Sequence, residues 1–186
     1  MQQVSFFREF GFPNKNTFSV KPIKAFLETE IDAGLWVDPF VRNSIFKDRM
    51  WMTNDLNPEF EADFNIDAIE FLKTIPDESV DGVLFDPPYS PRQVKECYNA
   101  VGRTVTQEDT QSSFYTKIKE EISRITKPGA KVIRFGWVSS GIGPKFGFEM
   151  TKVMLVWHGG NHNDTIITVE TKTLHEGETH DSTKSS

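Results

Sequence analysis

Short apolar runs that end in an acidic residue recur along the first half of the sequence, with helical patterns between them. The runs 35–37, 51–53, 64–66 and 80–85 are each closed by an aspartate, and these aspartates are Asp38, Asp55, Asp67 and Asp86. Apolar runs of this length between turn residues are typical of buried strands. Because the strands alternate with helices, the sequence predicts an α/β fold with a mostly parallel sheet and helices on both faces.

Helical spacing marks three segments, and a turn marks a hairpin. Apolar residues recur every three or four positions over 21–33, 67–75 and 112–127, and Pro128-Gly129 is expected to end the last of these helices. The runs 153–157 and 166–169 flank a Gly-Gly-Asn-His-Asn-Asp turn and predict an antiparallel pair of strands. Only about a dozen residues separate runs 35–37 and 51–53, so any helix between them must be very short.

Length and composition narrow the class of protein. A chain of 186 residues fits one domain, which we expect over residues 1–172 with an irregular lead-in over 1–20, followed by a disordered tail over 173–186. The net charge of −6 argues against a protein that grips nucleic acid through its overall field. The single cysteine, Cys97, favours a reducing compartment. No apolar run approaches the roughly 18 residues of a membrane span, so we expect a soluble, cytoplasmic protein.

The aspartates at the strand ends are candidates for ligand binding. In open α/β sheets, ligands bind beyond the carboxyl ends of the strands. A single acid at such a place is often only a helix cap or a turn residue. Four in succession favour a ligand with hydroxyl and amino groups, because carboxylates accept hydrogen bonds from both. No G-x-G-x-x-G follows a predicted strand, which argues against a dinucleotide oxidoreductase.

The stretch Asp86-Pro87-Pro88-Tyr89 resembles the active-site motif of class I S-adenosylmethionine-dependent methyltransferases that act on the amino groups of nucleic acids. The resemblance is strongest to small adenine-type DNA methyltransferases of phages and prophages, through residues 37–40, 53–58 and 84–98, and extends over about residues 12–170. It implies a Rossmann-like class I methyltransferase sheet with an antiparallel terminal hairpin. It also implies S-adenosylmethionine as cofactor, nucleic acid (most simply DNA) as partner, and the host cytoplasm for a phage-encoded chain.

The motif has a chemical explanation. An exocyclic amine is a poor nucleophile because its lone pair is conjugated with the ring, and hydrogen bonds accepted from its N–H groups make that pair more available. Asp86 and the Pro87 carbonyl are the expected acceptors, while Pro87 and Pro88 lack N–H groups and fix the turn. Tyr89 would stack on a base rotated out of its helix. A stiff turn without catalytic function is the alternative explanation.

The resemblance also implies which strand ends hold the cofactor. Asp38-Pro39-Phe40 would lie beside its methionine part, Asn54 or Asp55 at its ribose hydroxyls, and Asp67 with Ala68 at its adenine amine. Each assignment places a hydrogen-bond acceptor or an apolar wall at the carboxyl end of a predicted strand. These residues are therefore the predicted cofactor site.

Two features bear on the methionine end of that site. Phe18 and Lys21 resemble the motif that closes over the cofactor, although a helix start explains them equally well. The loop Val41-Arg42-Asn43-Ser44 lacks the glycines that the family has there. Either Arg42 or Asn43 replaces part of the lost contact, for example at the cofactor carboxylate, or cofactor affinity is weak.

Substrate recognition is expected in residues 90–113, where Arg92 and Lys95 are candidate phosphate contacts, and an ordinary helix and loop is the alternative. The segment is short, so a dimer or a partner protein could assist in holding DNA. We expect no metal, because a hairpin turn accounts for the group of His158, His162 and Asp164. The predicted activity is methylation of adenine N6 in DNA. The alternatives are cytosine N4 in DNA, an exocyclic amine in RNA, and a catalytically inactive binding module.

Overall fold

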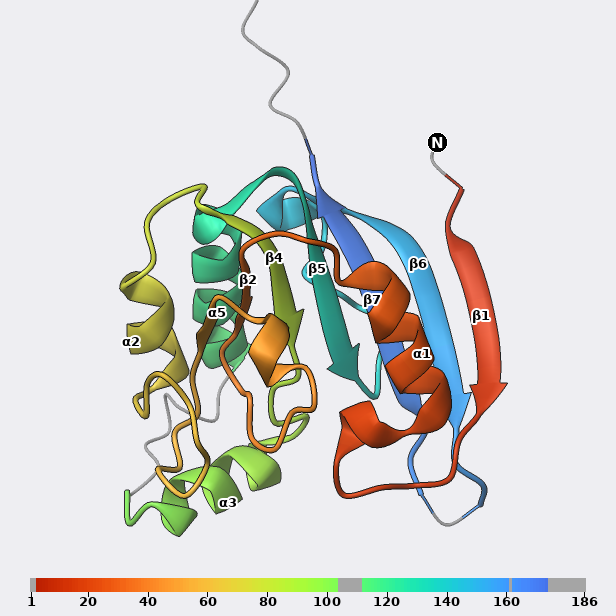
Figure 1. Ribbon diagram of the computed structural model, residues 1–186, viewed down its shortest axis with the longest axis horizontal. Helices are drawn as coiled ribbons and strands as arrows, with labels where there is room; N and C mark the ends of the chain where they lie inside the picture. The colour runs from red at the N-terminus through yellow and green to blue at the C-terminus, as the bar shows by residue number, and fades with distance from the viewer. Residues whose placement is uncertain (1–2, 104–111, 161, 174–186) are drawn as a thin grey trace, which may run out of the picture.

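A seven-stranded sheet forms the centre of the molecule (Figure 1). The computed structural model describes residues 3–103, 112–160 and 162–173, and the strand order within them is β1-β6-β7-β5-β4-β2-β3. The strands are β1 (Ser5–Phe10), β2 (Trp36–Asp38), β3 (Met52–Thr53), β4 (Val80–Phe85), β5 (Thr126–Gly136), β6 (Phe148–Trp157) and β7 (Thr165–Lys172). β7 runs antiparallel to β5 and β6, whereas the other neighbouring strands are parallel. The predicted mostly parallel sheet with an antiparallel hairpin is confirmed.

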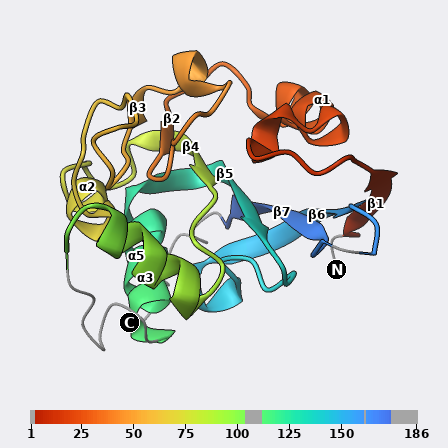
Figure 2. The ribbon, with the colours of Figure 1, turned by 90° about the horizontal axis from the view of Figure 1, so that it is seen from below.

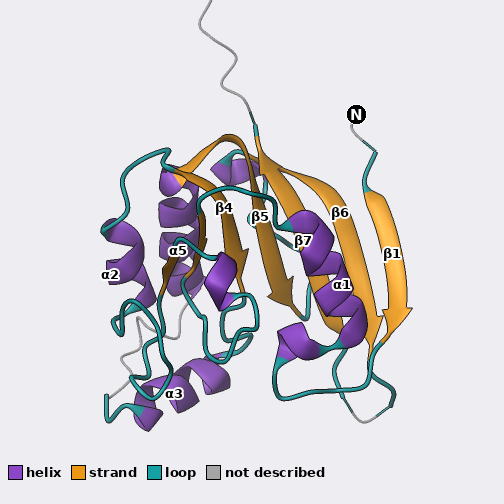
Figure 3. Cartoon of the chain, in the orientation of Figure 1, coloured by secondary structure: helices purple, strands orange, loops and turns teal. Residues whose placement is uncertain are grey.

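Helices lie on both faces of this sheet (Figures 2 and 3). They are α1 (Lys21–Glu30), α2 (Ala68–Lys73), α3 (Pro91–Ala100) and α5 (Ser112–Ile125), with the 3₁₀ helices η1 (Thr17–Ser19), η2 (Lys47–Arg49) and η3 (Pro144–Phe146). α1 packs on one face of β5, β6 and β7, and α2 and α5 pack on the opposite face of β4 and β5. α3 lies beyond the carboxyl ends of the strands, at the bottom of Figure 1.

Local chemistry explains the placement of several elements. The Asp67 carboxylate caps α2 by accepting a hydrogen bond from Ile69 N at 2.8 Å. Pro22 lies in the first turn of α1, where a missing N–H costs nothing. Gly82 of β4 lies against the Trp36 ring, and a Cβ at this glycine would come within 2.4 Å of ring atoms. The buried indole of β2 therefore requires glycine on the neighbouring strand.

The register of the parallel strands brings their carboxyl ends to one edge. Trp36 of β2 pairs with Gly82 of β4, and Val37 pairs with Met52 of β3. Asp38 ends β2, and Asp86 directly follows β4. The aspartates that are scattered along the sequence therefore meet at the same edge of the sheet.

Three local predictions are corrected by the structure. The lead-in is not irregular throughout, because Ser5–Phe10 forms the edge strand β1, and all six of its residues are exposed, which explains the missing apolar pattern. The segment 64–66 makes only an isolated bridge from Phe64 to Asn54 rather than a full strand. The helix expected to stop at Pro128-Gly129 ends earlier, at Ile125, because those two residues lie inside β5.

Some expectations fall outside the described residues. These are the tail from residue 174 onward and the part of the candidate recognition segment over 104–111. In the part of the chain that the structure covers, no helix is both long and apolar enough to cross a membrane.

Candidate functional site

Two adjoining cavities open where β2, β3 and β4 end. The larger has a volume of about 460 Å³ and the smaller a volume of about 40 Å³. Thr17, Phe40, Arg42 and Asp86 line both cavities, so the two share a wall at the carboxyl edge of the sheet. The larger volume lies within the range of roughly 300–1,000 Å³ that is typical of sites for small molecules and cofactors.

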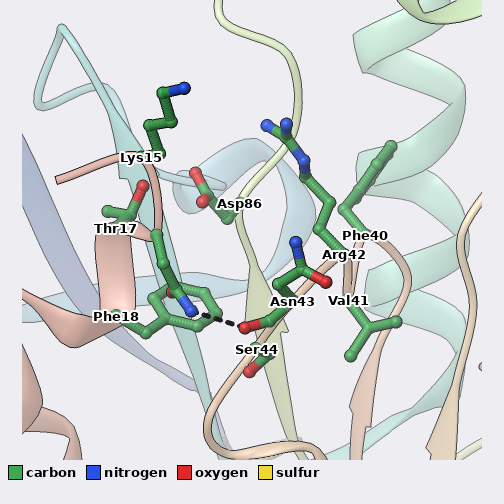
Figure 4. A pocket seen from close by; sticks show the side chains of 10 residues that line it. Lys15, Thr17, Phe18, Phe40, Val41, Arg42, Asn43, Ser44 and Asp86 are labelled. Atoms are coloured by element: carbon green, nitrogen blue, oxygen red, sulfur yellow. Dashed lines mark hydrogen bonds between the residues drawn. The ribbon is translucent and has the colours of Figure 1, made fainter. Parts of the chain in front are cut away.

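Most of the predicted site residues come together here. The larger cavity is lined by Pro39, Phe40, Asn54, Asp55, Asp67, Ala68, Asp86, Pro87, Pro88 and Tyr89. The smaller cavity is lined by Phe18 among others (Figure 4). Four predicted residues, Lys21, Asp38, Arg92 and Lys95, line neither cavity.

Asp86 lies where the two cavities meet. Its Oδ1 accepts a hydrogen bond from the Tyr89 hydroxyl. Burial raises the pKa of Asp86 to about 6, although the bond from Tyr89 and the positive charge of Arg42 both lower it. Among the described residues, no group donates to Asp86 Oδ2. Above pH 6 this side chain is therefore a charged acceptor with one oxygen available to a ligand.

Tyr89 is held by contacts on three sides. Its N–H donates to Gln93 Oε1 at 2.6 Å, and its ring packs edge-on against Trp137 with 5.5 Å between the ring centroids. Burial, together with the charge of Asp86, raises the pKa of Tyr89 well above its usual range, so the hydroxyl remains a proton donor. The hydroxyl is turned toward Asp86, and the stacking role of the ring stays a prediction.

The carbonyl groups of Pro87 and Pro88 differ in their hydrogen bonds to the described residues. The Tyr115 hydroxyl of α5 donates to the Pro88 carbonyl at 2.5 Å and so fixes the turn. Within the described chain, no donor contacts the Pro87 carbonyl. The acceptor that was predicted to assist Asp86 is therefore available beside it.

Asp38 lines neither cavity, so its predicted place beside the methionine part of the cofactor stays a prediction. The side chain is fully buried, and its Oδ1 accepts from Phe40 N at 2.9 Å, which holds the turn after β2. Its Oδ2 is buried without a hydrogen-bond partner among the described residues. Burial raises the pKa of Asp38 well above its usual range, and the neighbouring charges of Asp86 and Asp55 add to this effect.

Asp55, and not Asn54, is the acceptor available at the second strand end. The Asn54 amide is engaged at both ends, since it donates to the carbonyls of Pro39 and Ile66 and accepts from Ile66 N. Asp55 accepts from Arg42 N at 3.1 Å and from Asn57 N at 2.9 Å. Each carboxylate oxygen keeps further lone pairs for a ligand hydroxyl. Burial raises the pKa of Asp55.

Asp67 combines a structural role with a place in the cavity wall. One oxygen caps α2, and the other accepts from the Tyr98 hydroxyl of α3 at 2.6 Å. Ala68 beside it is buried at 5% exposure and presents an apolar wall. The aspartate thus joins α2 to α3 across the cavity, and a role at an adenine amine stays a prediction.

Arg42 occupies the position at which a glycine was expected. Its backbone has a φ of 43°, in the left-handed region that glycine adopts most readily. The guanidinium lies over the Phe60 ring at 5.6 Å and lines both cavities with Asp86 (Figure 4). It makes no ion pair with another described residue. The loop therefore keeps a glycine-like backbone and adds a cation to the cleft.

Lys15, and not Lys21, is the lysine that lines the cleft. Lys15 lies just before η1 and Thr17 begins it, and both residues line the smaller cavity (Figure 4). Lys21 begins α1 and is exposed outside this cavity. Phe18 is buried against Phe135 at 5.0 Å between ring centroids. The lead-in lacks periodicity, so no pattern in the sequence marked Lys15.

α3 contributes differently from the prediction. Arg92 and Lys95 are exposed and line neither cavity, and Arg92 is paired with Glu96 at 2.8 Å, an exposed ion pair of small energetic value. The inner face of α3 lines the larger cavity through Gln93, Val94, Cys97 and Tyr98. Their helical spacing was the signal that could have identified them.

His158 ties the hairpin to the residue after β1. Its Nδ1 is 2.7 Å from the Gly11 carbonyl and its Nε2 is 2.9 Å from Thr165 Oγ1, so both ring nitrogens are engaged. In the described ranges, no group of three or more histidine, cysteine, aspartate or glutamate side chains is placed to hold a metal ion.

Comparisons with solved structures find several proteins of similar architecture. The chain is similar to TrmN from Thermus thermophilus (TM-score 0.54, 15% identity, 82% of this chain and 49% of that one). It is also similar to 1,6-didemethyltoxoflavin-N1-methyltransferase from Burkholderia thailandensis with bound S-adenosylhomocysteine (TM-score 0.53, 11% identity, 83% and 78%). A SAM-dependent methyltransferase from Methanosarcina mazei gives a TM-score of 0.53 at 11% identity over 80% and 97%.

The fold is that of the Rossmann-like methyltransferases. The chain spans about half the length of the Thermus protein. No protein-family model matches the sequence, and no curated protein does. At these identities the similarity establishes the fold, and function has to be argued from the cleft.

Proposed function

We propose that this protein is an S-adenosylmethionine-dependent methyltransferase that acts on the exocyclic amine of a nucleic-acid base, with adenine N6 in DNA as the first candidate. The observation that carries the proposal is the position of Asp86. This acceptor follows β4 at the junction of the two cavities, beside the free Pro87 carbonyl. A stiff turn without catalytic function has no need of a partly buried carboxylate at the mouth of a cofactor-sized cavity.

The larger cavity fits the nucleoside part of the cofactor. Asp55 offers carboxylate oxygens to the ribose hydroxyls, and Asp67 lies at the start of α2. Phe40 and Ala68 supply apolar surface for the adenine ring. The volume of about 460 Å³ accommodates a ligand of this size.

The smaller cavity fits the amino-acid end. Arg42 and Lys15 both line it, together with the hydroxyls of Thr17 and Ser44 (Figure 4). A guanidinium without an ion-pair partner is suited to a carboxylate, because the two form charge-assisted hydrogen bonds. Arg42 therefore takes over the contact that glycines make in the motif that the sequence departs from.

The residues around Asp86 have defined tasks in the transfer. Bound S-adenosylmethionine supplies an activated methyl group. Asp86 Oδ2 and the Pro87 carbonyl accept hydrogen bonds from the two N–H groups of the amine and direct its lone pair toward the cofactor side of the cleft. Asp86, with a pKa of about 6, is suited to receive the proton that the amine loses when its new bond to carbon forms.

Two measurements test the proposal. Isothermal calorimetry with S-adenosylmethionine should detect binding, and its absence at high micromolar protein concentration would reject the cofactor. Incubation of labelled cofactor with DNA and with RNA, followed by nucleoside analysis, should find N6-methyl-2′-deoxyadenosine in DNA. Label found only in RNA, or only on cytosine, would reject adenine N6 in DNA as the substrate. Cofactor binding without transfer to either nucleic acid would favour an inactive binding module.

The matched variant is Asp86→Ala. It should abolish transfer and leave cofactor affinity within a few fold, because Asp55 and Arg42 remain in place. Loss of cofactor binding in this variant would show that the assignment of Asp86 to the amine is wrong.

A further inference from the structure

One half of the sheet has a helix on only one face. α1 packs against β6 and β7 through Ile23 and Leu27. On the opposite face, α2 and α5 reach β4 and β5, while the connection 137–147 between β5 and β6 contains only the three-residue η3. Figure 2 shows the β1 end of the sheet without a described helix on that side. The connection covers the β7 part of this face, where Thr168 and Glu170 are buried and Glu170 accepts hydrogen bonds from Ile142 N and Gly143 N. The open part is therefore the edge formed by β1 and the end of β6, and one solvated face is common where strands are antiparallel.

Alternation along β1 places aromatic rings on the uncovered face. Phe7 packs against Phe26 of α1, with 5.9 Å between ring centroids. Because successive side chains of a strand point to opposite faces, Phe6, Arg8 and Phe10 point away from α1. Their partners in register on β6 are Val153, Leu155 and Trp157.

The rings form an exposed strip. Phe6 is 65% exposed, Phe10 42% and Trp157 39%, and the centroids of Phe10 and Trp157 are 4.6 Å apart. Arg8 lies between the two phenylalanines along β1 and makes no ion pair with a described residue. We call Phe6, Arg8, Phe10 and Trp157 the aromatic face. An exposed apolar cluster of this kind ordinarily marks an interaction site.

We propose that the aromatic face binds single-stranded nucleic acid, with bases stacked on the rings and a phosphate at Arg8. The inference rests on the proposed function and names the form of its substrate. Aromatic rings on an open sheet surface, with a cation among them, suit unpaired bases and their backbone. A second copy of this chain is less suited, because a two-fold contact centred here would bring two unpaired guanidinium groups together in an apolar interface.

The aromatic face lies on the route to the cleft. Phe10 and Trp157 are the last residues of β1 and β6, and Asp86 follows β4, which runs parallel to both. Between them, Trp137 follows β5, is 41% exposed and contacts Tyr89. With strands about 4.8 Å apart, the path from β6 to β4 is about 15 Å. In this proposal, a strand that leaves the aromatic face at the carboxyl ends of β1 and β6 would pass Trp137 along this edge of the sheet before it reaches the amine site.

Fluorescence anisotropy with labelled oligo(dT) tests this surface separately from the amine site, because thymine has no exocyclic amine. The double variant Phe6→Thr with Phe10→Thr keeps strand-forming residues and should weaken binding by about 10- to 100-fold. Arg8→Gln should reduce the slope of log affinity against log salt by about 0.7. The control Leu35→Thr removes a 40% exposed apolar side chain beyond the amino end of β2 and should leave binding unchanged.

Several outcomes would overturn the proposal. These are equal binding of oligo(dT) by the double variant, no binding by the wild-type chain at low salt, and a dimer in sedimentation that the double variant dissociates. Calorimetry with S-adenosylmethionine on the same variants separates the two proposals. Unchanged cofactor affinity with lost oligo(dT) binding supports the aromatic face. Oligo(dT) binding that depends on the rings, in a chain that does not bind the cofactor, overturns the proposed function alone.

Discussion

Replacing Asp86 by Asn is expected to stabilise the protein while it removes the proposed catalytic acceptor. Burial raises the pKa of Asp86 from 3.8 to about 6. Holding this group ionised in the folded state at pH 8 therefore costs about 2 pK units, or about 3 kcal/mol. Asn carries no charge, and its oxygen still accepts the bond from Tyr89. The variant should therefore recover up to about 3 kcal/mol of unfolding free energy at pH 8.

The gain should depend on pH in a defined direction. Between pH 3.8 and 6 the folded protein keeps the Asp86 proton that the unfolded chain has released, so the wild-type stability from this group falls as pH rises through that window. Below pH 3.8 both states are protonated, and the penalty disappears. The difference between Asp86→Asn and wild type should accordingly be small at pH 4 and reach its plateau above pH 7.

Urea unfolding at several pH values between 4 and 8 measures this difference. For an m value of about 2 kcal/mol/M, a gain of about 3 kcal/mol moves the midpoint by about 1.5 M. Asp48→Asn, an exposed carboxylate on η2, is the control and should change stability by less than about 0.5 kcal/mol with no trend in pH. A loss of stability in Asp86→Asn at pH 8, or a gain that is the same at every pH, would refute the burial argument.

Three further changes have definite expected outcomes. Arg42→Gly should change the free energy of unfolding little in urea, because the φ of 43° suits glycine. The same variant should bind S-adenosylhomocysteine about tenfold more weakly in calorimetry. Its affinity for 5′-methylthioadenosine, which lacks the amino-acid end, should be unchanged. Tyr89→Phe should move the acid limb of the transfer rate to higher pH, because the hydrogen bond from Tyr89 lowers the pKa of Asp86 and its loss therefore raises that pKa; an unmoved limb would contradict this. Gly82→Ala should destabilise the fold by more than about 2 kcal/mol in urea unfolding, since its Cβ would meet the Trp36 ring at 2.4 Å, and a neutral result would show that the ring can shift.

Local signals predicted the sheet well and located the turn 86–89 at the end of β4. Asp86 was identifiable because the apolar run before it and the prolines after it are contiguous in sequence. The mostly parallel arrangement of the strands then followed from general rules of α/β connection. The Asp67 helix cap was visible for the same reason, since capping depends on residues within one turn.

Features set by tertiary contacts were not predictable. No signal in the neighbouring sequence indicates that the Asn54 amide is hydrogen-bonded to Pro39 and Ile66, or that Asp38 is fully buried. β1 has no buried face at an edge, so it lacks the apolar alternation that reveals a strand. The placement of Lys15 in the cleft depends on how η1 turns the chain toward the loop after β2.

The bond from the Tyr89 hydroxyl to Asp86 has a consequence for base selection. Because the hydroxyl occupies Oδ1, the oxygen left for an amino N–H of adenine or cytosine in the proposed reaction is Oδ2. A base with only carbonyl oxygens at the corresponding position offers none, and it leaves a buried carboxylate short of a donor, a loss of about 1–3 kcal/mol. Under the proposed function, the tyrosine would thus fix which oxygen stays open, and a base with an amino group could donate to it where thymine or uracil could not, so that discrimination would begin before any methyl group moves.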